Sequence, residues 1–130
     1  MTAMFRLDGK RVLVTGAGRG IGRAIAEAYA EAGAAVTLCA RTEAEITAVA
    51  EALRAAGHQA EVLVCDVTDI AGFAAAIAER PAYDVFVNNA GTNRPKPLTE
   101  VSEEDYDAVI DLNVKAAIFA AKAVTGRMLD

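Results

Sequence analysis

Residues 12–22, which read Val-Leu-Val-Thr-Gly-Ala-Gly-Arg-Gly-Ile-Gly, decide the fold of this chain. A short apolar run, Val12 to Val14, leads straight into a glycine-rich turn, and a helical pattern begins near Ile21. Glycine has no Cβ, so such a turn bends tightly and lets the backbone approach a ligand closely. The helix that follows offers unpaired N–H groups and the positive end of its dipole to an anion. The stretch therefore predicts a strand, a phosphate-binding turn and a helix.

The spacing of these glycines leaves three interpretations open. The common dinucleotide pattern Gly-x-Gly-x-x-Gly fails in every register, because Ile21, Arg23 and Ile25 take the third glycine position. The last three glycines fit Gly-x-Gly-x-Gly, a spacing that methyltransferases use. The run that starts at Thr15 also fits Thr-Gly-x-x-x-Gly-x-Gly, a different nucleotide-binding variant. A glycine-rich turn without any ligand is the third possibility.

Composition narrows the function classes. The 130 residues carry a net charge of −5, and hydrophobic residues make up 54% of them. An acidic chain with scattered cations is a poor nucleic-acid binder, and no apolar run is long enough to span a bilayer. Met1 to Lys10 contains no apolar signal core. We therefore expect a cytoplasmic protein of one domain, residues 1–130, that binds neither nucleic acid nor membrane.

The two cysteines do not indicate a metal site or a disulfide. Cys39 and Cys65 each end an apolar, strand-like run, and they are neither closely spaced nor accompanied by a cluster of histidines. We expect buried free thiols in a reducing compartment and no metal site.

Strand and helix patterns alternate along the whole chain. The expected strands are 11–15, 35–40, 60–65 and 84–88. Helical patterns begin after the glycine turn, at the capping-box motif Thr42-Glu43-Ala44-Glu45, near residue 70 and at the cap Ser102. Strands separated by helices predict right-handed crossovers and a parallel sheet of the α/β class. Residues 89–101 form the one long loop, at the end of the sheet where ligands bind.

Apolar stripes predict which face of each helix is buried. The first helix shows Ile21, Ile25, Ala28 and Ala32, and the second shows Ile46, Val49 and Leu53. In the fourth helix, the stripe contains Tyr106, Val109, Ile110, Asn113, Ala117 and Ala121. Asn113 is thus expected on a buried face, either as a satisfied core amide or, with the register off by a turn, on the helix surface.

The end of the second strand predicts which nucleotide is preferred. In a doubly wound sheet, an acidic residue there binds the ribose of NAD, whereas an arginine accommodates the 2′-phosphate of NADP. This strand runs into Ala40-Arg41, without an acid, and Arg19 in the glycine turn is a second candidate. We expect NADP(H) rather than NAD(H), with two solvated surface arginines as the alternative. The missing acid also argues against a methyltransferase.

Together these residues resemble the short-chain dehydrogenase/reductase family over about residues 7–125. Residues 15–22 match its Thr-Gly-x-x-x-Gly-x-Gly turn, and Cys65-Asp66-Val67 resembles its third-strand end, where the aspartate meets adenine. Asn88-Asn89-Ala90-Gly91 matches its Asn-Asn-Ala-Gly motif, and Asn113 matches its catalytic asparagine. The resemblance implies a partial Rossmann-type fold of about four strands in the order 3-2-1-4. It implies cofactor contacts from Gly16, Arg19, Gly20, Ile21, Gly22, Arg41, Asp66, Val67, Asn88, Ala90 and Gly91. Without it, Asp66 reads as a helix cap and the paired asparagines as loop caps.

The family's reaction, hydride transfer between NADP(H) and a carbonyl or alcohol, needs residues that this sequence lacks. None of Tyr29, Tyr83 and Tyr106 is followed by lysine four residues later, and the only serine is Ser102. The chain therefore resembles the N-terminal half of a family member, and we expect it to be inactive alone. The alternative is a half-domain that binds a dinucleotide without catalysis.

Two further expectations concern partners. The loop carries Arg94 and Lys96, which suit a hydroxylated or anionic substrate such as a sugar acid or an acyl-carrier thioester, unless the loop is merely solvated. The fourth strand would lie at an open edge, and the last helix is rich in alanine. We therefore expect a homo-oligomer, either a dimer or a tetramer.

Overall fold

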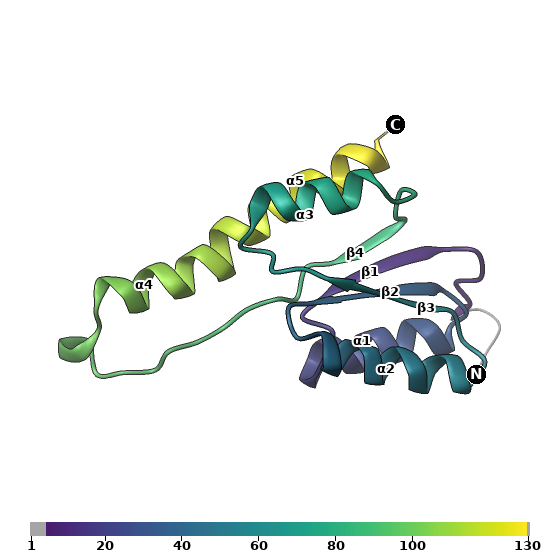
Figure 1. Ribbon diagram of the computed structural model, residues 1–130, viewed down its shortest axis with the longest axis horizontal. Coiled ribbons are helices and arrows are strands. Elements are labelled where there is room, and N and C mark those ends of the chain that lie inside the picture. Colours follow the sequence, from purple (N-terminus) through teal and green to yellow (C-terminus); the bar gives the residue numbers. More distant parts are fainter. Residues whose placement is uncertain (1–4, 130) are drawn as a thin grey trace.

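A parallel sheet of four strands lies at the centre of the molecule, with helices on both faces (Figure 1). The computed structural model describes residues 5–129. Its strands are β1 (Arg11–Thr15), β2 (Ala35–Ala40), β3 (Ala60–Val64) and β4 (Val85–Val87), in the order β3-β2-β1-β4. Every pairing is parallel, with Val14 of β1 opposite Leu38 of β2 and Val87 of β4. The predicted class and strand order are confirmed, although the last two strands are slightly shorter than expected.

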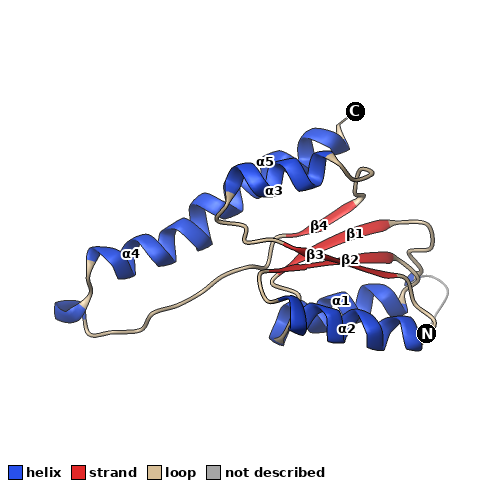
Figure 2. Cartoon of the chain, viewed as in Figure 1, coloured by secondary structure: helices blue, strands red, loops and turns tan. Residues whose placement is uncertain are grey.

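The helices divide into two layers (Figure 2). On one face lie α1 (Gly20–Glu31) and α2 (Glu43–Ala55), and on the other lie α3 (Ile70–Ala78) and α5 (Ala117–Met128). A long loop after β4 leads through the short 3-10 helix η2 (Leu98–Glu100) to α4 (Glu103–Ile110), which projects beyond the sheet. The π-helical segment η3 (Asp111–Ala116) joins α4 to α5. Within the described residues, no helix has the length and apolar character needed to cross a membrane.

Each face of the sheet has its own core. Val14 and Leu38 point toward α1 and α2 and are fully buried, whereas Leu13 and Cys39 point toward α3 and α5 and are equally buried. Neighbouring strand residues alternate in this way because successive side chains point to opposite faces. A strand covered on both faces has to be apolar throughout, which explains the high hydrophobic content of the chain.

The predicted buried face of the first helix is right for Ala32, which is buried, and for Ile25, which packs against the core, but wrong for Ile21 and Ala28; that of α2 is confirmed. Ile21 is 73% exposed and Ala28 is also exposed, and the buried residues of α1 are Gly22, Ala26 and Ala30. The helix packs closely on the sheet through small residues, so the larger Ile21 is displaced from the contact. In α2 the predicted stripe of Ile46, Val49 and Leu53 is buried.

The C-terminal helical region differs from the predicted continuous helix. Its buried apolar residues are Ala116, Ala120 and Val124, while Tyr106 and Asn113 of the predicted stripe are exposed. The π-helical segment is the physical reason. Its i→i+5 hydrogen bonds take more residues per turn than an α-helix does, so the face that continues into α5 is rotated. In addition, α4 extends beyond the end of the sheet (Figure 1), and Glu103, Glu104, Tyr106 and Asp107 are exposed.

Only one of the two predicted helix caps forms. Ser102 accepts a hydrogen bond from the Asp105 N–H, and the Asp105 carboxylate accepts one from the Ser102 N–H, which completes a capping box. Thr42 makes no such side-chain bond, so the predicted capping box at α2 is wrong. Its neighbour Glu45 instead has its Cβ against Gly18, which draws that side chain toward the glycine turn.

The buried hydroxyl of Thr15 joins the carboxyl ends of β1 and β4. Its Oγ1 accepts hydrogen bonds from the N–H groups of Asn89 at 3.0 Å and Ala90 at 3.1 Å, and donates to the Val87 carbonyl at 3.4 Å. The residue has no exposed surface. One hydroxyl therefore holds the chain in place where β4 ends and the long loop begins.

We predict that Thr15→Val destabilises the chain, because the nearly isosteric valine removes the acceptor of the half-buried Ala90 N–H and one of the two acceptors of the Asn89 N–H, which also bonds to the Val87 carbonyl. The expected loss is about 1–3 kcal/mol in the free energy of unfolding, measured by urea denaturation. Thr125→Val is the matched control, since Thr125 is exposed and bonds only to the Ala121 carbonyl in its own helix. Equal stability of the two variants would contradict a structural role for this hydroxyl.

Candidate functional site

A groove of about 690 Å³ lies at the carboxyl ends of the strands. Its walls come from the glycine turn, from the ends of β2 and β3, from the loop after β4 and from the helical region that begins at α4. Open parallel sheets bind ligands at this end. The groove is therefore the candidate site.

The glycine turn brings backbone to the groove where side chains would obstruct it. Gly16 and Gly20 adopt left-handed conformations, with φ of +63° and +58°. A Cβ on Gly22 would clash with the Gly16 carbonyl oxygen and would lie 2.5 Å from Nδ2 of Asn89. No side chain caps the N-terminus of α1, so the N–H groups of its first turn have no partner within the helix. The turn thus presents free backbone donors and a positive dipole end, and both favour an anionic ligand.

The two neighbouring asparagines after β4 hold two different elements. Nδ2 of Asn89 donates to the carbonyls of Thr15 and Gly16, at 3.3 Å each, and so braces the glycine turn. Nδ2 of Asn88 donates to the Ala117 carbonyl at 2.8 Å, at the start of α5. Asn89 lines the groove and Asn88 does not. Neither residue simply caps its own loop, because each bonds to an element distant in sequence.

Asp66 stands at the end of β3 with its carboxylate fixed toward the groove. Its Oδ1 accepts hydrogen bonds from the N–H of Thr68 at 3.0 Å and from the Thr68 hydroxyl at 2.7 Å. These bonds hold the pKa of Asp66 below its usual range. The cap of α3 is Asp69, whose Oδ1 accepts from the Gly72 N–H at 3.1 Å. The alternative of Asp66 as the helix cap is therefore wrong.

Two arginines line the groove near the end of β2. Arg19 and Arg41 are exposed, and neither forms a salt bridge within residues 5–129. Glu45 lines the same part of the groove. The Asp66 carboxylate, which interacts with the charge of Arg41, is a second acidic group here, but neither arginine is held in a salt bridge among the described residues, so both guanidinium groups can meet an anionic ligand.

Asn113 holds the loop after β4 by two hydrogen bonds. Its Oδ1 accepts from the Thr92 N–H and its Nδ2 donates to the Thr92 carbonyl, both at 2.8 Å. The amide is satisfied by loop backbone rather than inside an apolar core, and the residue is exposed. The prediction of a buried position is therefore wrong. Asn113 itself does not line the groove, but Thr92 does.

A cluster around Asp105 fixes the next part of the same loop. The Lys96 ammonium lies 2.7 Å from Asp105 Oδ2, and the Arg94 guanidinium lies 3.4 Å from Oδ1. The Lys96 hydrogen bond, with further bonds from Ser102 and Arg94, holds the pKa of Asp105 far below its usual range. Asp105 is only 6% exposed. The loop is thus attached to α4 through the Asp105 carboxylate.

Eight of the predicted site residues line the groove and four lie outside it. Those in the groove are Gly16, Arg19, Gly20, Arg41, Asp66, Val67, Ala90 and Gly91, and those outside are Ile21, Gly22, Asn88 and Asn113. Glu45, Thr68, Thr92 and Asp111 also line it, although the sequence did not single them out as site residues. Thr68 was detectable as a threonine two residues after an aspartate at a strand end, a local turn pattern. Asp111 carried no comparable signal.

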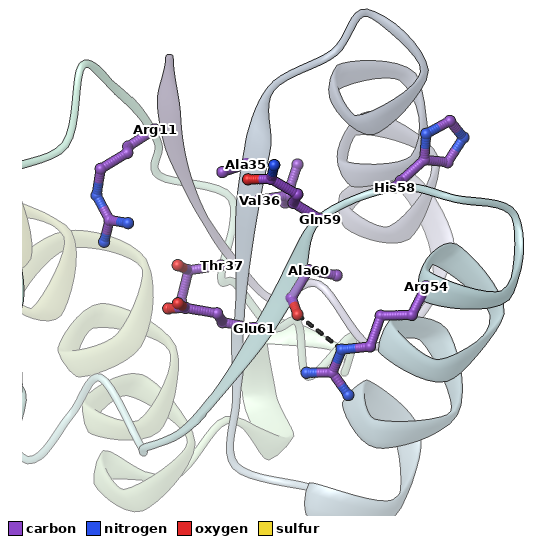
Figure 3. A pocket seen from close by; sticks show the side chains of 9 residues that line it. All are labelled: Arg11, Ala35, Val36, Thr37, Arg54, His58, Gln59, Ala60 and Glu61. Carbon is purple, nitrogen blue, oxygen red and sulfur yellow. Dashed lines mark hydrogen bonds between the residues drawn. The ribbon is translucent and has the colours of Figure 1, made fainter. Parts of the chain in front are cut away.

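A second cavity, of about 340 Å³, lies at the amino ends of the strands (Figure 3). Its polar residues do not converge on one point. Arg11 and Arg54 point to opposite sides of the strands, and Arg54 Nε donates to the Ala60 carbonyl at 2.9 Å. The Arg11 guanidinium lies over the Tyr83 ring, 4.8 Å from its centroid. Both arginines thus make contacts within the fold.

Both cysteines are free thiols that line the groove; Cys39 is buried, as predicted, whereas Cys65 is only half-buried. Burial raises the pKa of Cys39 to about 12, so its thiol is inert. Cys65 is half-buried, and burial, with the nearby Asp69 and Asp66 carboxylates, raises its pKa as well.

We predict that a ligand in the groove protects Cys65 from alkylation. Because its pKa is raised, reaction with iodoacetamide should be slow at pH 7 and should accelerate as the pH rises toward that pKa. Saturating NADPH should slow it further, roughly tenfold or more, as measured by mass spectrometry with Cys39→Ser to isolate the site. An unchanged rate with NADPH present would count against occupation of the groove beside Cys65.

We also predict that Gly22→Ala disrupts the turn while Gly126→Ala does not. The first change forces a methyl group into the Gly16 carbonyl, and overpacking of this kind costs about 1–3 kcal/mol or more. At Gly126, in the exposed part of α5, a Cβ would meet nothing within 4 Å, and alanine should stabilise the helix by roughly 0.5–1 kcal/mol. Thermal unfolding compares them. A Gly22→Ala protein as stable as the parent would refute the close approach.

Comparison with known proteins agrees with this geometry. The family model for the short chain dehydrogenases matches residues 10–130. The chain is 39% identical to gluconate 5-dehydrogenase of Gluconobacter oxydans over 130 residues, which cover 97% of this chain and 51% of that protein. It is 41% identical to galactitol 2-dehydrogenase of Rhizobium johnstonii over 131 residues, with coverages of 96% and 50%. The chain therefore spans about half the length of these relatives.

Solved structures share the fold as well as the sequence. A gluconate 5-dehydrogenase from Burkholderia cenocepacia, in complex with NADP and tartrate, superposes with a TM-score of 0.90 and 40% identity. The match covers 96% of this chain and 51% of that one. A metagenomic short-chain oxidoreductase in complex with NADP gives a TM-score of 0.88 and 38% identity, with coverages of 95% and 58%.

Proposed function

Because the chain belongs to the short-chain dehydrogenase family, we propose that it forms the cofactor-binding part of an NADP(H)-dependent oxidoreductase. The observation that carries the proposal is the uncapped N-terminus of α1, which faces a groove beside glycines that leave no room for side chains. NADP(H), when bound, supplies or accepts the hydride that interconverts an alcohol and a carbonyl compound. The residues of this chain bind that cofactor and orient it.

The glycine turn would hold the pyrophosphate. Gly16 and Gly20 line the groove with their backbone, whereas Ile21 and Gly22 lie outside its lining. Ile21, whose side chain is 73% exposed, would contribute its N–H group at the helix start. Gly22 would act indirectly, by allowing α1 to approach Gly16.

The far end of the groove would hold the adenosine. Asp66 is ionised and has its Oδ2 without a hydrogen bond from residues 5–129, so it can accept one from the adenine amino group. Val67 offers an apolar side for the ring, and Arg41 and Arg19 supply cations for a 2′-phosphate. NADP in the two similar structures supports the preference for NADP(H) over NAD(H).

The opposite end would hold the nicotinamide near Ala90 and Gly91. Asn88 would act on this end only through α5, and Asn113 only through Thr92. We propose Asn113 as the family's catalytic asparagine on its position in the sequence and on its hold on this loop. No tyrosine in the 130 residues is followed by lysine four positions later, so the proton-transfer pair of the family is not among these residues.

A second candidate is a dinucleotide-binding module without catalysis. The missing Tyr-x-x-x-Lys favours it for this chain taken alone. Both candidates predict NADPH binding, and only the first predicts hydride transfer by the complete natural polypeptide. Reduction of NADP⁺ by a panel of polyols and hydroxy acids, followed at 340 nm, separates them.

We predict that Arg41→Ala weakens NADPH binding and leaves NADH binding nearly unchanged, because only NADPH offers a phosphate to this guanidinium. A charge-assisted hydrogen bond contributes about 1.5–3 kcal/mol, which corresponds to roughly a 10- to 100-fold change in Kd. Arg23→Ala is the control, since Arg23 pairs with Glu27 on the surface of α1, outside the groove. Calorimetry that finds equal losses for both cofactors would refute the phosphate role.

A further inference from the structure

We propose that Arg94 binds the carboxylate of the substrate, which makes a polyhydroxy acid the preferred substrate class. This inference rests on the oxidoreductase function proposed above, and it concerns the end of the groove that the cofactor residues leave open. Arg94 has no part in the cofactor contacts assigned so far.

The position of Arg94 places it at the substrate end of the groove. Asp66 follows β3, which is one edge of the sheet, and Arg94 lies in the loop after β4, which is the other edge among the described strands. Both residues line the same groove. A dinucleotide with its adenine at Asp66 therefore has its nicotinamide directed toward the loop that carries Arg94.

The charge around Arg94 leaves its guanidinium available. Lys96 forms the short contact with Asp105, at 2.7 Å, and so neutralises that carboxylate. Arg94 reaches Asp105 through Nη1 alone, at 3.4 Å, and its side chain is 43% exposed. The cluster of Arg94, Lys96 and Asp105 contains two cations and one anion, so it carries an excess positive charge although the net charge of the chain is −5. A carboxylate in the groove would accept hydrogen bonds from the other N–H groups of the Arg94 guanidinium.

The backbone that carries Arg94 is held on both sides. Thr92 is bound at both its N–H and its carbonyl by Asn113, and Lys96 is bound by Asp105. Pro95 and Pro97 restrict the backbone between these anchors. Less conformational freedom is then lost when a ligand binds, which favours specific recognition.

The chemistry of this wall favours a hydroxy acid over other anions. The planar guanidinium matches the two oxygens of a carboxylate. Asp111 lines the groove too and has no salt bridge among the described residues, and its oxygens accept hydrogen bonds from hydroxyl groups. A ligand that carries both a carboxylate and several hydroxyls satisfies both residues. A neutral thioester would leave the N–H groups of Arg94 that do not face Asp105 without a charged partner.

The test compares gluconate with glucitol, which share a carbon skeleton and differ at C1, a carboxylate in one and a hydroxymethyl group in the other. The complete natural polypeptide is assayed with NADP⁺, together with its Arg94→Gln, Arg94→Lys and Lys10→Gln variants. Lys10 is an exposed cation outside the groove, so its variant controls for the loss of one charge. Direct binding of gluconate is measured by calorimetry, with and without NADP⁺, so that the result does not depend on turnover.

We expect Arg94→Gln to weaken gluconate binding and to raise its KM by roughly 10- to 100-fold, with less than a twofold change for glucitol. Arg94→Lys should recover part of the loss, and Lys10→Gln should show none. Equal losses for the two compounds, no loss for either, or tighter binding of glucitol than of gluconate by the parent would overturn the inference. Failure of the parent to bind NADPH would instead overturn the proposed function, while gluconate binding still decides the role of Arg94.

Discussion

The close approach of α1 to the end of β1 is the constraint on which the rest of the structure depends. It exists because Gly22 has no side chain, and the Asn89 amide, which donates to the carbonyls of Thr15 and Gly16, fixes it from the opposite side. The Thr15 hydroxyl then holds the start of the loop after β4 against the same point. The contacts of Gly22, Asn89 and Thr15 thus fix the positions of the helix N-terminus, the glycine turn and the loop relative to one another. The groove lies between these three elements.

Much of this arrangement could be predicted from the sequence, because it follows from local patterns. Short apolar runs predict the strands, and the helical patterns between these runs predict that the strands are parallel. The sequence-based predictions are wrong where tertiary contacts or an uncommon helix geometry determine the position of a residue. Ile21 is exposed because the contact of α1 requires small residues, and Asn113 is exposed because a π-helical segment rotates the helix. Asp105 forms salt bridges with Lys96 and Arg94, which lie nine and eleven positions before it in the chain, and no sequence motif predicts this cluster.

The distribution of charge explains how an acidic chain can bind an anionic cofactor. The net charge of −5 is a property of the whole chain, whereas the groove has arginines at both ends. Arg19 and Arg41 lie where a ribose phosphate is expected, and Arg94 lies where the substrate is expected. Between them the turn contributes backbone N–H groups, which carry no net charge. Recognition of the nucleotide therefore depends on where the positive groups are placed, and not on their number.

The most direct test of this account is to map NADPH binding onto backbone amides by ¹H–¹⁵N correlation NMR of the isotopically labelled chain. The account predicts the largest shifts at Gly18 to Gly22, with further shifts at Asp66, Val67 and Ala90. The amide signals of residues at the other end of the strands, such as His58 and Glu61, should not shift. Shifts confined to that second cavity, or none at saturating NADPH, would contradict the claim that the glycine turn and the start of α1 form the cofactor site.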